Sequence, residues 1–312
     1  MLQKLSEDPR VTVRRAGPPD PAGRCVVYWM QRAQRATDNP ALNVAVNVGN
    51  ELGKPVVVFF APVPFYPHAN ARHYRFLADG ISDIAEALGR RHIGFVLRTY
   101  PRHSLLTFCR EVQSSIVIGD ENPLREPERW RVRVAKELAV PFWTVDADVI
   151  VPTKLLQREQ YAARTIRPRI QNLLPKFLVL PNPEARVPWT LPPGVDSLSL
   201  YEDFTRGWTL DRSVQPVRQW RGGSKAALQR LSTFVRQGLA NYPYARNHPE
   251  CDGTSQLSPY LHFGHLGPHT VATKRGCAFA GQTGIPGTAN RSARALSKLC
   301  AIQSRLRLDG MP

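Results

Sequence analysis

The sequence of 312 residues exceeds one typical domain, and its apolar content of 42% is enough for a sizeable core, which excludes a globally disordered chain. The formal net charge of +17 creates a field that attracts polyanions, so nucleic acid is the first partner to consider. The five cysteines include no Cys-x-x-Cys pair and no apolar run could span a bilayer, which indicates a soluble, cytoplasmic protein without structural zinc.

Strand and helix patterns alternate over the first half of the chain. Residues 1–23 are polar and rich in proline and glycine, so we expect a loose arm there. From residue 24 to 150, short apolar segments alternate with segments of helical periodicity, which predicts a parallel sheet covered by helices on both faces. Asp38 or Asn39 is the expected cap of the first helix, with Pro40 in its first turn. The expected strands are 25–29, 55–60, 93–97, 115–118 and 141–145, and the expected helices are 40–52, 71–88, 105–112 and 127–138.

The pattern changes beyond residue 150. A cluster of prolines too dense for a helix or a central strand predicts a linker over residues 151–223. Helical periodicity resumes over residues 224–271, where Leu228 and Leu231 are spaced as core positions. Residues 272–312 lack sustained apolar periodicity, so we expect a disordered or loosely packed tail. The clustered prolines are Pro181, Pro183, Pro188, Pro192 and Pro193.

A concentration of hydrogen-bond donors marks the segment 253–264. Ser258 before Pro259 is typical of a helix start, because the serine oxygen accepts from first-turn amides and proline has no amide to leave unpaired. The positive end of that helix would then face the hydroxyls of Thr254 and Ser255, which suits a phosphate or a pyrophosphate. An ordinary capped helix without a ligand is the alternative that these residues alone leave open.

Three segments, in chain order, resemble one protein family. The segment 242–264 has the pattern Tyr-x3-Arg-Asn-x-Pro-x4-Thr-Ser-x-Leu-Ser-Pro-Tyr-Leu-x-Phe-Gly, which resembles the start of the flavin-binding domain in the DNA photolyase/cryptochrome family. The other two are similar to the N-terminal signature and the interdomain segment of class II cyclobutane pyrimidine dimer photolyases. These two matches are carried by Tyr28-Trp29-Met30-Gln31-Arg32-Ala33-Gln34-Arg35-x2-Asp38-Asn39-x-Ala41-Leu42 and by Tyr161-Ala162-Ala163-Arg164-Thr165-x-Arg167-Pro168-x-Ile170.

The resemblance implies a Rossmann-like antenna domain over residues 24–150 and the start of an all-α FAD-binding domain over residues 224–271. It implies light-dependent repair of pyrimidine dimers in DNA by electron transfer from reduced FAD. It also implies an antenna chromophore, a deazaflavin or a folate, and a monomeric protein. By the match, Arg246 would contact a DNA phosphate, and the flavin diphosphate would lie near Tyr242, Thr254, Ser255, Gln256, Leu257 and Ser258.

The resemblance ends near Val271. Residues 272–312 have no counterpart to the family's later helices, so we expect a shifted reading frame or an early stop there, and weak or no FAD binding by this chain. No catalytic residue is identifiable. His262, His265 and His269 are at helical spacings, but they lack an added carboxylate or cysteine pattern and predict no metal site. The alternative function is a non-enzymatic nucleic-acid or nucleotide-binding α/β protein.

Overall fold

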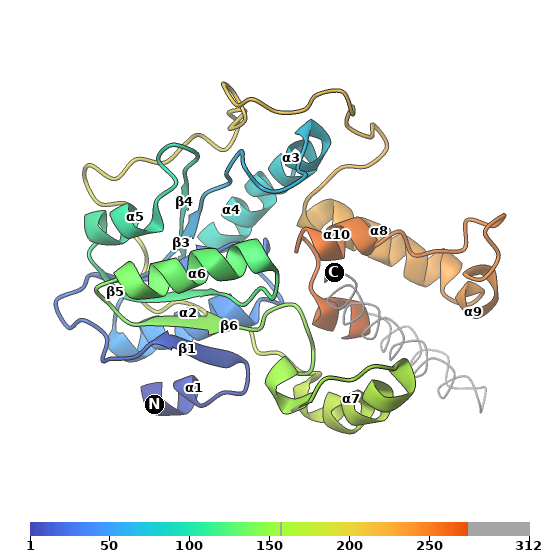
Figure 1. Cartoon of the computed structure of the whole chain (residues 1–312), viewed down its shortest axis with the longest axis horizontal. Helices are drawn as coiled ribbons and strands as arrows, with labels where there is room; N and C mark the ends of the chain where they lie inside the picture. Colours follow the sequence, from blue (N-terminus) through green and yellow to red (C-terminus); the bar gives the residue numbers. More distant parts are fainter. Residues whose placement is uncertain (157, 274–312) are drawn as a thin grey trace.

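The computed structural model describes residues 1–156 and 158–273, which form an α/β domain joined to a group of helices (Figure 1). Within these residues, six strands form one sheet in the order β1-β6-β5-β2-β3-β4. Neighbouring strands are parallel except β1, which pairs antiparallel with β6. The expected α/β fold is confirmed. The strands are β1 Val11–Arg15, β2 Cys25–Met30, β3 Val56–Phe60, β4 Gly94–Leu97, β5 Ser114–Asp120 and β6 Phe142–Val145.

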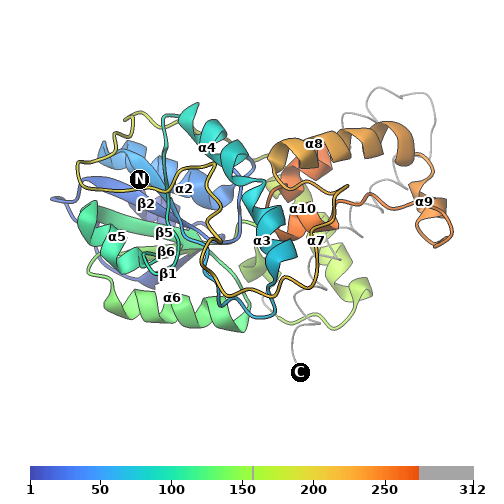
Figure 2. The ribbon, with the colours of Figure 1, turned by 90° about the horizontal axis from the view of Figure 1, so that it is seen from above.

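Helices cover both faces of the sheet, with α2 and α4 on one side and α6 on the other (Figure 2). In β2, Val26 and Tyr28 belong to one hydrophobic cluster, whereas Val27 and Trp29 belong to the other. Because successive side chains of a strand point to opposite faces, a strand buried on both faces needs an uninterrupted apolar run. The first cluster includes residues of α2 (Pro40–Leu52) and α4 (Ile81–Gly89), and the second includes residues of α5 (Leu105–Glu111) and α6 (Arg125–Glu137).

Helix α2 begins and ends where its sequence predicts. Asn39, rather than Asp38, is the cap, because its side chain accepts from the amide of Leu42 at 3.0 Å. Pro40 takes the first helical position, and Gly53 ends the helix with a left-handed φ of 63°. The carboxylate of Asp38 is therefore available for contacts outside the helix.

The expectation of a loose arm over residues 1–23 is wrong. Leu2–Ser6 form the short helix α1, and β1 adds an antiparallel edge strand to β6. Val11 is buried beneath this edge, and Arg14 forms ion pairs with two glutamates. A five-residue strand that contains two arginines gives only a weak alternating pattern, so the surrounding prolines and glycines dominate the composition.

The linker region 151–223 contains a helix that its sequence does not predict. Helix α7 spans Ala163–Phe177 with Pro168 and Pro175 inside it. Proline normally ends a helix because it lacks the amide donor. Here Ile166 and Ile170, four residues apart, are buried in a small cluster that holds the helix together.

The proline-rich part of the linker lies along the α/β domain. The Arg91 guanidinium donates to the Pro183 carbonyl, and the Trp189 amide donates to the His92 carbonyl at 3.1 Å. Further on, the Leu198 amide donates to a carbonyl of the edge strand β4 at 2.8 Å. These bonds satisfy backbone groups that a sheet edge otherwise leaves open.

The helix expected over residues 71–88 is two helices, α3 (Ala71–Ala78) and α4, separated at Gly80. A Cβ added to Gly80 would lie 3.2 Å from the Cα of Gly223 and 2.8 Å from the imidazole of His265. The break therefore lets the chain before α8 (Ser224–Thr233) approach α4 closely. Lys225 at the start of α8 reinforces this contact through an ion pair of 2.6 Å with Glu86.

Of the remaining helices, α8 and α10 (Ser258–His262) lie beside α3 and α4, whereas α9 (Tyr242–Ala245) lies farther from them (Figures 1 and 2). A wider π-helical turn, Phe234–Gly238, follows α8, and the short helices α9 and α10 come next. Among the described helices, none has both the length and the apolar character needed to cross a membrane. The predicted reading-frame change lies almost wholly outside the described residues. The buried core of this group consists of Ala227, Leu231, Leu257, Tyr260, Leu266 and Val271.

Candidate functional site

The loop between α9 and α10 carries most of the predicted site residues. A Cβ added to Gly253 would lie 2.4 Å from the carbonyl carbon of Ala245, so the loop lies directly against the end of α9. Arg246 follows Ala245 at that end of α9, and Thr254 follows Gly253. The fold thereby brings the two halves of the predicted motif next to each other.

The start of α10 differs from the prediction by one residue. Leu257 is the N-cap, Ser258 is the first helical residue and Pro259 is the second. Leu257 is 1% exposed, and its anchored side chain holds the backbone in a helical conformation one residue early. The predicted Ser258 cap is therefore wrong: its side chain makes no capping hydrogen bond and is exposed.

Three successive backbone amides in this loop are unpaired. The N–H groups of Thr254, Ser255 and Gln256 donate to no acceptor within residues 1–156 and 158–273. The hydroxyls of Thr254 and Ser258 are exposed on the same short stretch. Adjacent free amides form a concave set of partial positive charges that suits an anion.

The other predicted side chains in the loop are engaged within the protein. The Ser255 hydroxyl accepts from the amide of Leu257 at 3.4 Å. The amide group of Gln256 donates to both carboxylate oxygens of Asp252, at 2.7 and 2.8 Å. Leu257 belongs to the core. Gln256 can therefore serve an anion only through its backbone amide, and the amide of Leu257 is already engaged by Ser255.

Tyr242 and Arg246 form a separate pair on α9. Tyr242 packs edge-on against Phe234, with ring centroids 5.3 Å apart. The guanidinium carbon of Arg246 lies 5.7 Å from the centre of the Tyr242 ring, and its buried Nε has no acceptor among the residues placed here. A cation held on an aromatic face keeps its hydrogen-bond donors for another partner.

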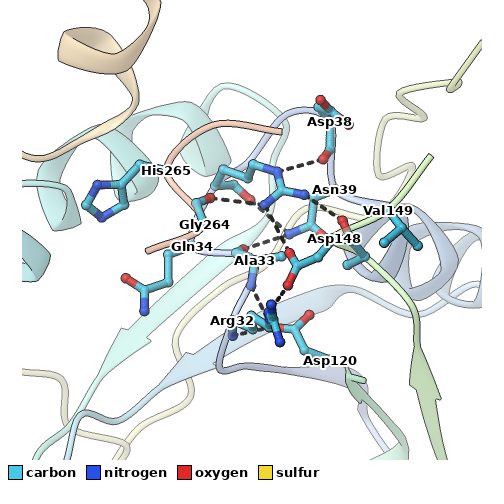
Figure 3. A network of polar contacts seen from close by, with 12 residues as sticks. Arg32, Ala33, Gln34, Asp38, Asn39, Asp120, Asp148, Val149, Gly264 and His265 are labelled. Carbon is cyan, nitrogen blue, oxygen red and sulfur yellow. Dashed lines mark hydrogen bonds and ion pairs between the residues drawn. The ribbon is translucent and has the colours of Figure 1, made fainter. Parts of the chain in front are cut away.

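A second polar centre, missed by the sequence reasoning, lies at the carboxyl end of β2 (Figure 3). One carboxylate oxygen of Asp120 accepts from the amides of Gln31, Arg32 and Ala33 at 2.6–2.9 Å. The other accepts from the hydroxyl of Tyr28 at 2.6 Å. Burial and then the Asp120 charge raise the pKa of Tyr28 well above its ordinary value, so this phenol stays a donor.

Arg35 links this centre to the C-terminal helices. Its side chain is 2% exposed and donates to the carbonyls of Asp38, Gly264 and Ala147 at 2.7, 3.1 and 2.7 Å. The carboxylate of Asp148 lies 3.7 Å away. These partners come from the loop after β2, the loop after β6 and the chain after α10. The segment that resembles the class II signature is thus the junction between the two parts of the molecule.

Asp38 and His269 form the other half of the junction. His269 Nδ1 lies 2.8 Å from Asp38 Oδ1, and its Nε2 lies 3.0 Å from the Phe177 carbonyl. Both ring nitrogens are therefore engaged, one with the loop after β2 and the other with the end of α7. Although burial opposes ionisation of Asp38, the His269 hydrogen bond and the Arg35 charge hold the pKa of that carboxyl below its usual value.

The three C-terminal histidines have different surroundings. His265 is buried, and its Nδ1 accepts from the amide of Gly223 at 2.9 Å. Burial, helped by the Arg35 charge, lowers the pKa of His265 to about 4, so it is neutral at pH 7. His262 is exposed on α10, whereas His269 is held by Asp38. Among the described residues, no group of three potential ligands could hold a metal ion.

Half-exposed aromatic side chains gather where β3 and β4 end. Phe65 is 52% exposed and meets Tyr100, His103 and Trp130 edge-on, with ring centroids 5.8–6.3 Å apart. Ligands of open parallel sheets collect at the carboxyl ends of the strands. We call Phe65, Tyr66, Tyr100, His103 and Trp130 the aromatic group.

The mostly parallel sheet, with its carboxyl edge joined to helices, defines an α/β protein of the Rossmann-like class. Comparison with known proteins gives the family. The sequence profile described as DNA photolyase matches residues 26–188, more than half of the chain. The chain belongs to the DNA photolyase/cryptochrome family.

Relatives and solved structures agree with this assignment. The chain is 35% identical to the deoxyribodipyrimidine photo-lyase of Methanothermobacter thermautotrophicus and 33% identical to that of Potorous tridactylus, over 82% and 77% of its length. It spans 57% and 46% of those proteins. In fold it is similar to a class III photolyase from Agrobacterium tumefaciens (TM-score 0.64, 18% identity) and a cryptochrome from Synechocystis (0.67, 16%). These matches cover 92% and 94% of this chain and 59% and 61% of the others.

Proposed function

We propose that this chain belongs to the class II photolyases, which repair cyclobutane pyrimidine dimers in DNA in a light-dependent reaction with reduced FAD. The observation that carries the proposal is the loop 254–258, where three free amides and two exposed hydroxyls lie next to the end of α9. A relative that is 35% identical is named deoxyribodipyrimidine photo-lyase. The segment that resembles the class II signature contains Arg35, which joins the two parts of the molecule. This match supports the choice of class II.

The donor set fits the diphosphate of FAD. A diphosphate offers many oxygen acceptors and negative charge, and the loop offers amide and hydroxyl donors without a neighbouring unpaired carboxylate, since Asp252 is held by Gln256. The amides of Thr254, Ser255 and Gln256 would bind the phosphate oxygens, and Tyr242 would support the same face. When bound, FAD supplies the light-driven electron transfer that opens the cyclobutane ring. The protein orients the cofactor and excludes water.

Arg246 would bind a phosphate of the DNA backbone. Its guanidinium is positioned by the Tyr242 ring and has no carboxylate partner within the part of the chain that the structure describes. Such contacts fix the register of a protein on a duplex without reading the sequence.

The molecule would act as a monomer in the cytoplasm. The aromatic group would hold the flat antenna chromophore, a deazaflavin or a folate, because its exposed rings offer stacking surfaces.

Replacing the hydroxyls of Thr254 and Ser255 tests the flavin assignment. We expect Thr254→Ala combined with Ser255→Ala to weaken FAD binding about tenfold to a hundredfold, since the exposed Thr254 hydroxyl is lost as a donor to a charged oxygen and the Ser255 hydroxyl no longer supports the loop. Titration of FAD fluorescence with the purified chain measures this change. The matched control is Ser232→Ala with Thr233→Ala on α8. Equal affinity of the double variant and the wild type would contradict a diphosphate bound at these hydroxyls.

DNA binding is expected to depend steeply on salt and little on sequence. If about six phosphates are contacted, the affinity for a short duplex falls roughly a thousandfold between 50 and 200 mM salt. Arg246→Gln should reduce the slope of log K against log salt by about one, because one phosphate contact is removed. Arg133→Gln on the exposed face of α6 serves as the control. An affinity that stays constant with salt contradicts the assignment.

The non-enzymatic alternative is less well supported, because the comparisons assign the chain to a family whose curated relatives are named as photo-lyases. The two possibilities differ in colour. A protein that retains FAD absorbs blue light, whereas a simple nucleic-acid-binding protein does not. The absorption spectrum after reconstitution with FAD distinguishes them.

A further inference from the structure

The side chain of Arg230 on α8 contacts the loop 254–258. Its Nε donates to the carbonyl of Ser255 at 3.2 Å, and the bond is partly buried. No carboxylate lies within ion-pair distance of Arg230 in residues 1–156 and 158–273. The four N–H groups of its terminal nitrogens likewise have no acceptor among those residues.

Within the described part of the chain, no carboxylate around Arg230 forms an ion pair with it. The carboxylate of Asp252 is occupied by the side chain of Gln256. Tyr260 lies close enough for the arginine charge to oppose the rise in pKa that burial gives its phenol, but that phenol donates to the Arg221 carbonyl. Because the guanidinium is only half-buried, its terminal donors stay open to an anion from solution.

We propose that Arg230 supplies the counter-charge for the diphosphate in the loop 254–258 and fixes its position. This inference rests on the proposed function. The bond from Nε to the Ser255 carbonyl anchors one edge of the guanidinium at the loop that carries the free amides. The opposite edge keeps two parallel donors, the geometry that matches the oxygens of a phosphate.

Neighbouring cations are less suited to this role. Lys225 is committed to Glu86 and Asp83 on α4. Arg246 lies on the Tyr242 ring at the end of α9. Arg230 is therefore the cation that hydrogen bonding joins directly to the loop. The site should accordingly select ligands by their diphosphate, binding FAD and ADP through it and gaining nothing from Arg230 with riboflavin.

The test compares three probes on the purified chain: FAD, ADP and riboflavin. Arg230→Gln is expected to weaken FAD and ADP binding at least tenfold and to leave riboflavin binding unchanged. It should also weaken the salt dependence of ADP binding, because a cation whose attraction salt screens has been removed. Arg230→Lys should give an intermediate loss, because the charge remains and the paired donors are lost. Arg236→Gln, an exposed arginine in the turn after α8, is the matched control.

The outcomes separate the two proposals. If Thr254→Ala with Ser255→Ala weakens FAD and ADP but Arg230→Gln does not, the role of Arg230 is overturned and the loop remains the site. If the wild type binds neither FAD nor ADP, both proposals are overturned. An equal loss of riboflavin, FAD and ADP in Arg230→Gln would mean that the residue only holds the fold. Retained binding by Arg230→Lys at wild-type strength would contradict paired phosphate donors.

Discussion

Arg35→Ala is expected to lower the free energy of unfolding by about 3–5 kcal/mol, which is a large part of the stability of an ordinary domain. The substitution leaves the carboxylate of Asp148 without one of its cations in a site that is 14% exposed. It also leaves three carbonyls without the donor that satisfies them, those of Asp38, Ala147 and Gly264.

Urea denaturation measures this effect as a shift in midpoint. Arg133→Ala is the matched control, because Arg133 is 78% exposed and its pair with Glu137 is a surface pair four residues apart. That control should change the stability by less than about 1 kcal/mol. A loss of similar size in both variants would show that the Arg35 junction does not stabilise the fold.

Acid is expected to destabilise the protein between about pH 6.5 and pH 4, because His265 is protonated less readily in the folded protein than in the unfolded chain. The folded-state pKa of His265 is lowered from 6.5 to about 4, so between these values the unfolded chain binds more protons than the folded one. The contribution of His265 is therefore fully present above pH 6.5 and is lost as the pH falls towards 4. The full change amounts to about 3 kcal/mol.

His265→Asn isolates that contribution. An asparagine oxygen can accept from the Gly223 amide as His265 Nδ1 does, but it does not titrate. The measurement is the urea midpoint at several pH values between 4 and 7, where the variant should show a flatter dependence. Asp38 acts in a lower window, because its lowered pKa preserves stability until the pH falls below 3.8. Profiles of the same steepness would contradict the assignment.

The fold could be predicted from sequence wherever burial alone decides the residue type. The run Cys25–Met30 is apolar at every position because both faces of β2 are covered, and such a run predicts a central strand. The edge strand β1 has one covered face and two arginines, so it lacks that signal. Helix α7 was not predicted, because its prolines indicate the end of a helix. The packing of Ile166 and Ile170 that stabilises the helix is not visible in the sequence.

The sequence points to candidate site residues only where neighbours in the chain act together. The loop 254–258 is a local motif, but its unpaired amides are those of Thr254, Ser255 and Gln256 rather than those of the first helical turn, and Ser258 is not the cap. Asp120 binds amides that are 87–89 residues away, and no local pattern links it to them. Its position as the last residue of β5, beside the end of β2, is the signal that would have found it. Arg230 gives no such signal, because its partner becomes apparent only when α8 packs on the loop.

The close approach of Gly264 to the loop after β2 also sets an order of events during synthesis. Gly264 has a left-handed φ of 73°, and a Cβ there would lie 1.8 Å from the Arg32 carbonyl oxygen, so only glycine fits. Arg35 and its partner Gly264 are 229 residues apart. At about 5–20 residues per second, the ribosome needs roughly 10–45 s to deliver that partner. Until then the Arg35 guanidinium lacks one of its acceptors, and the C-terminal helices cannot yet pack against the carboxyl edge of the sheet.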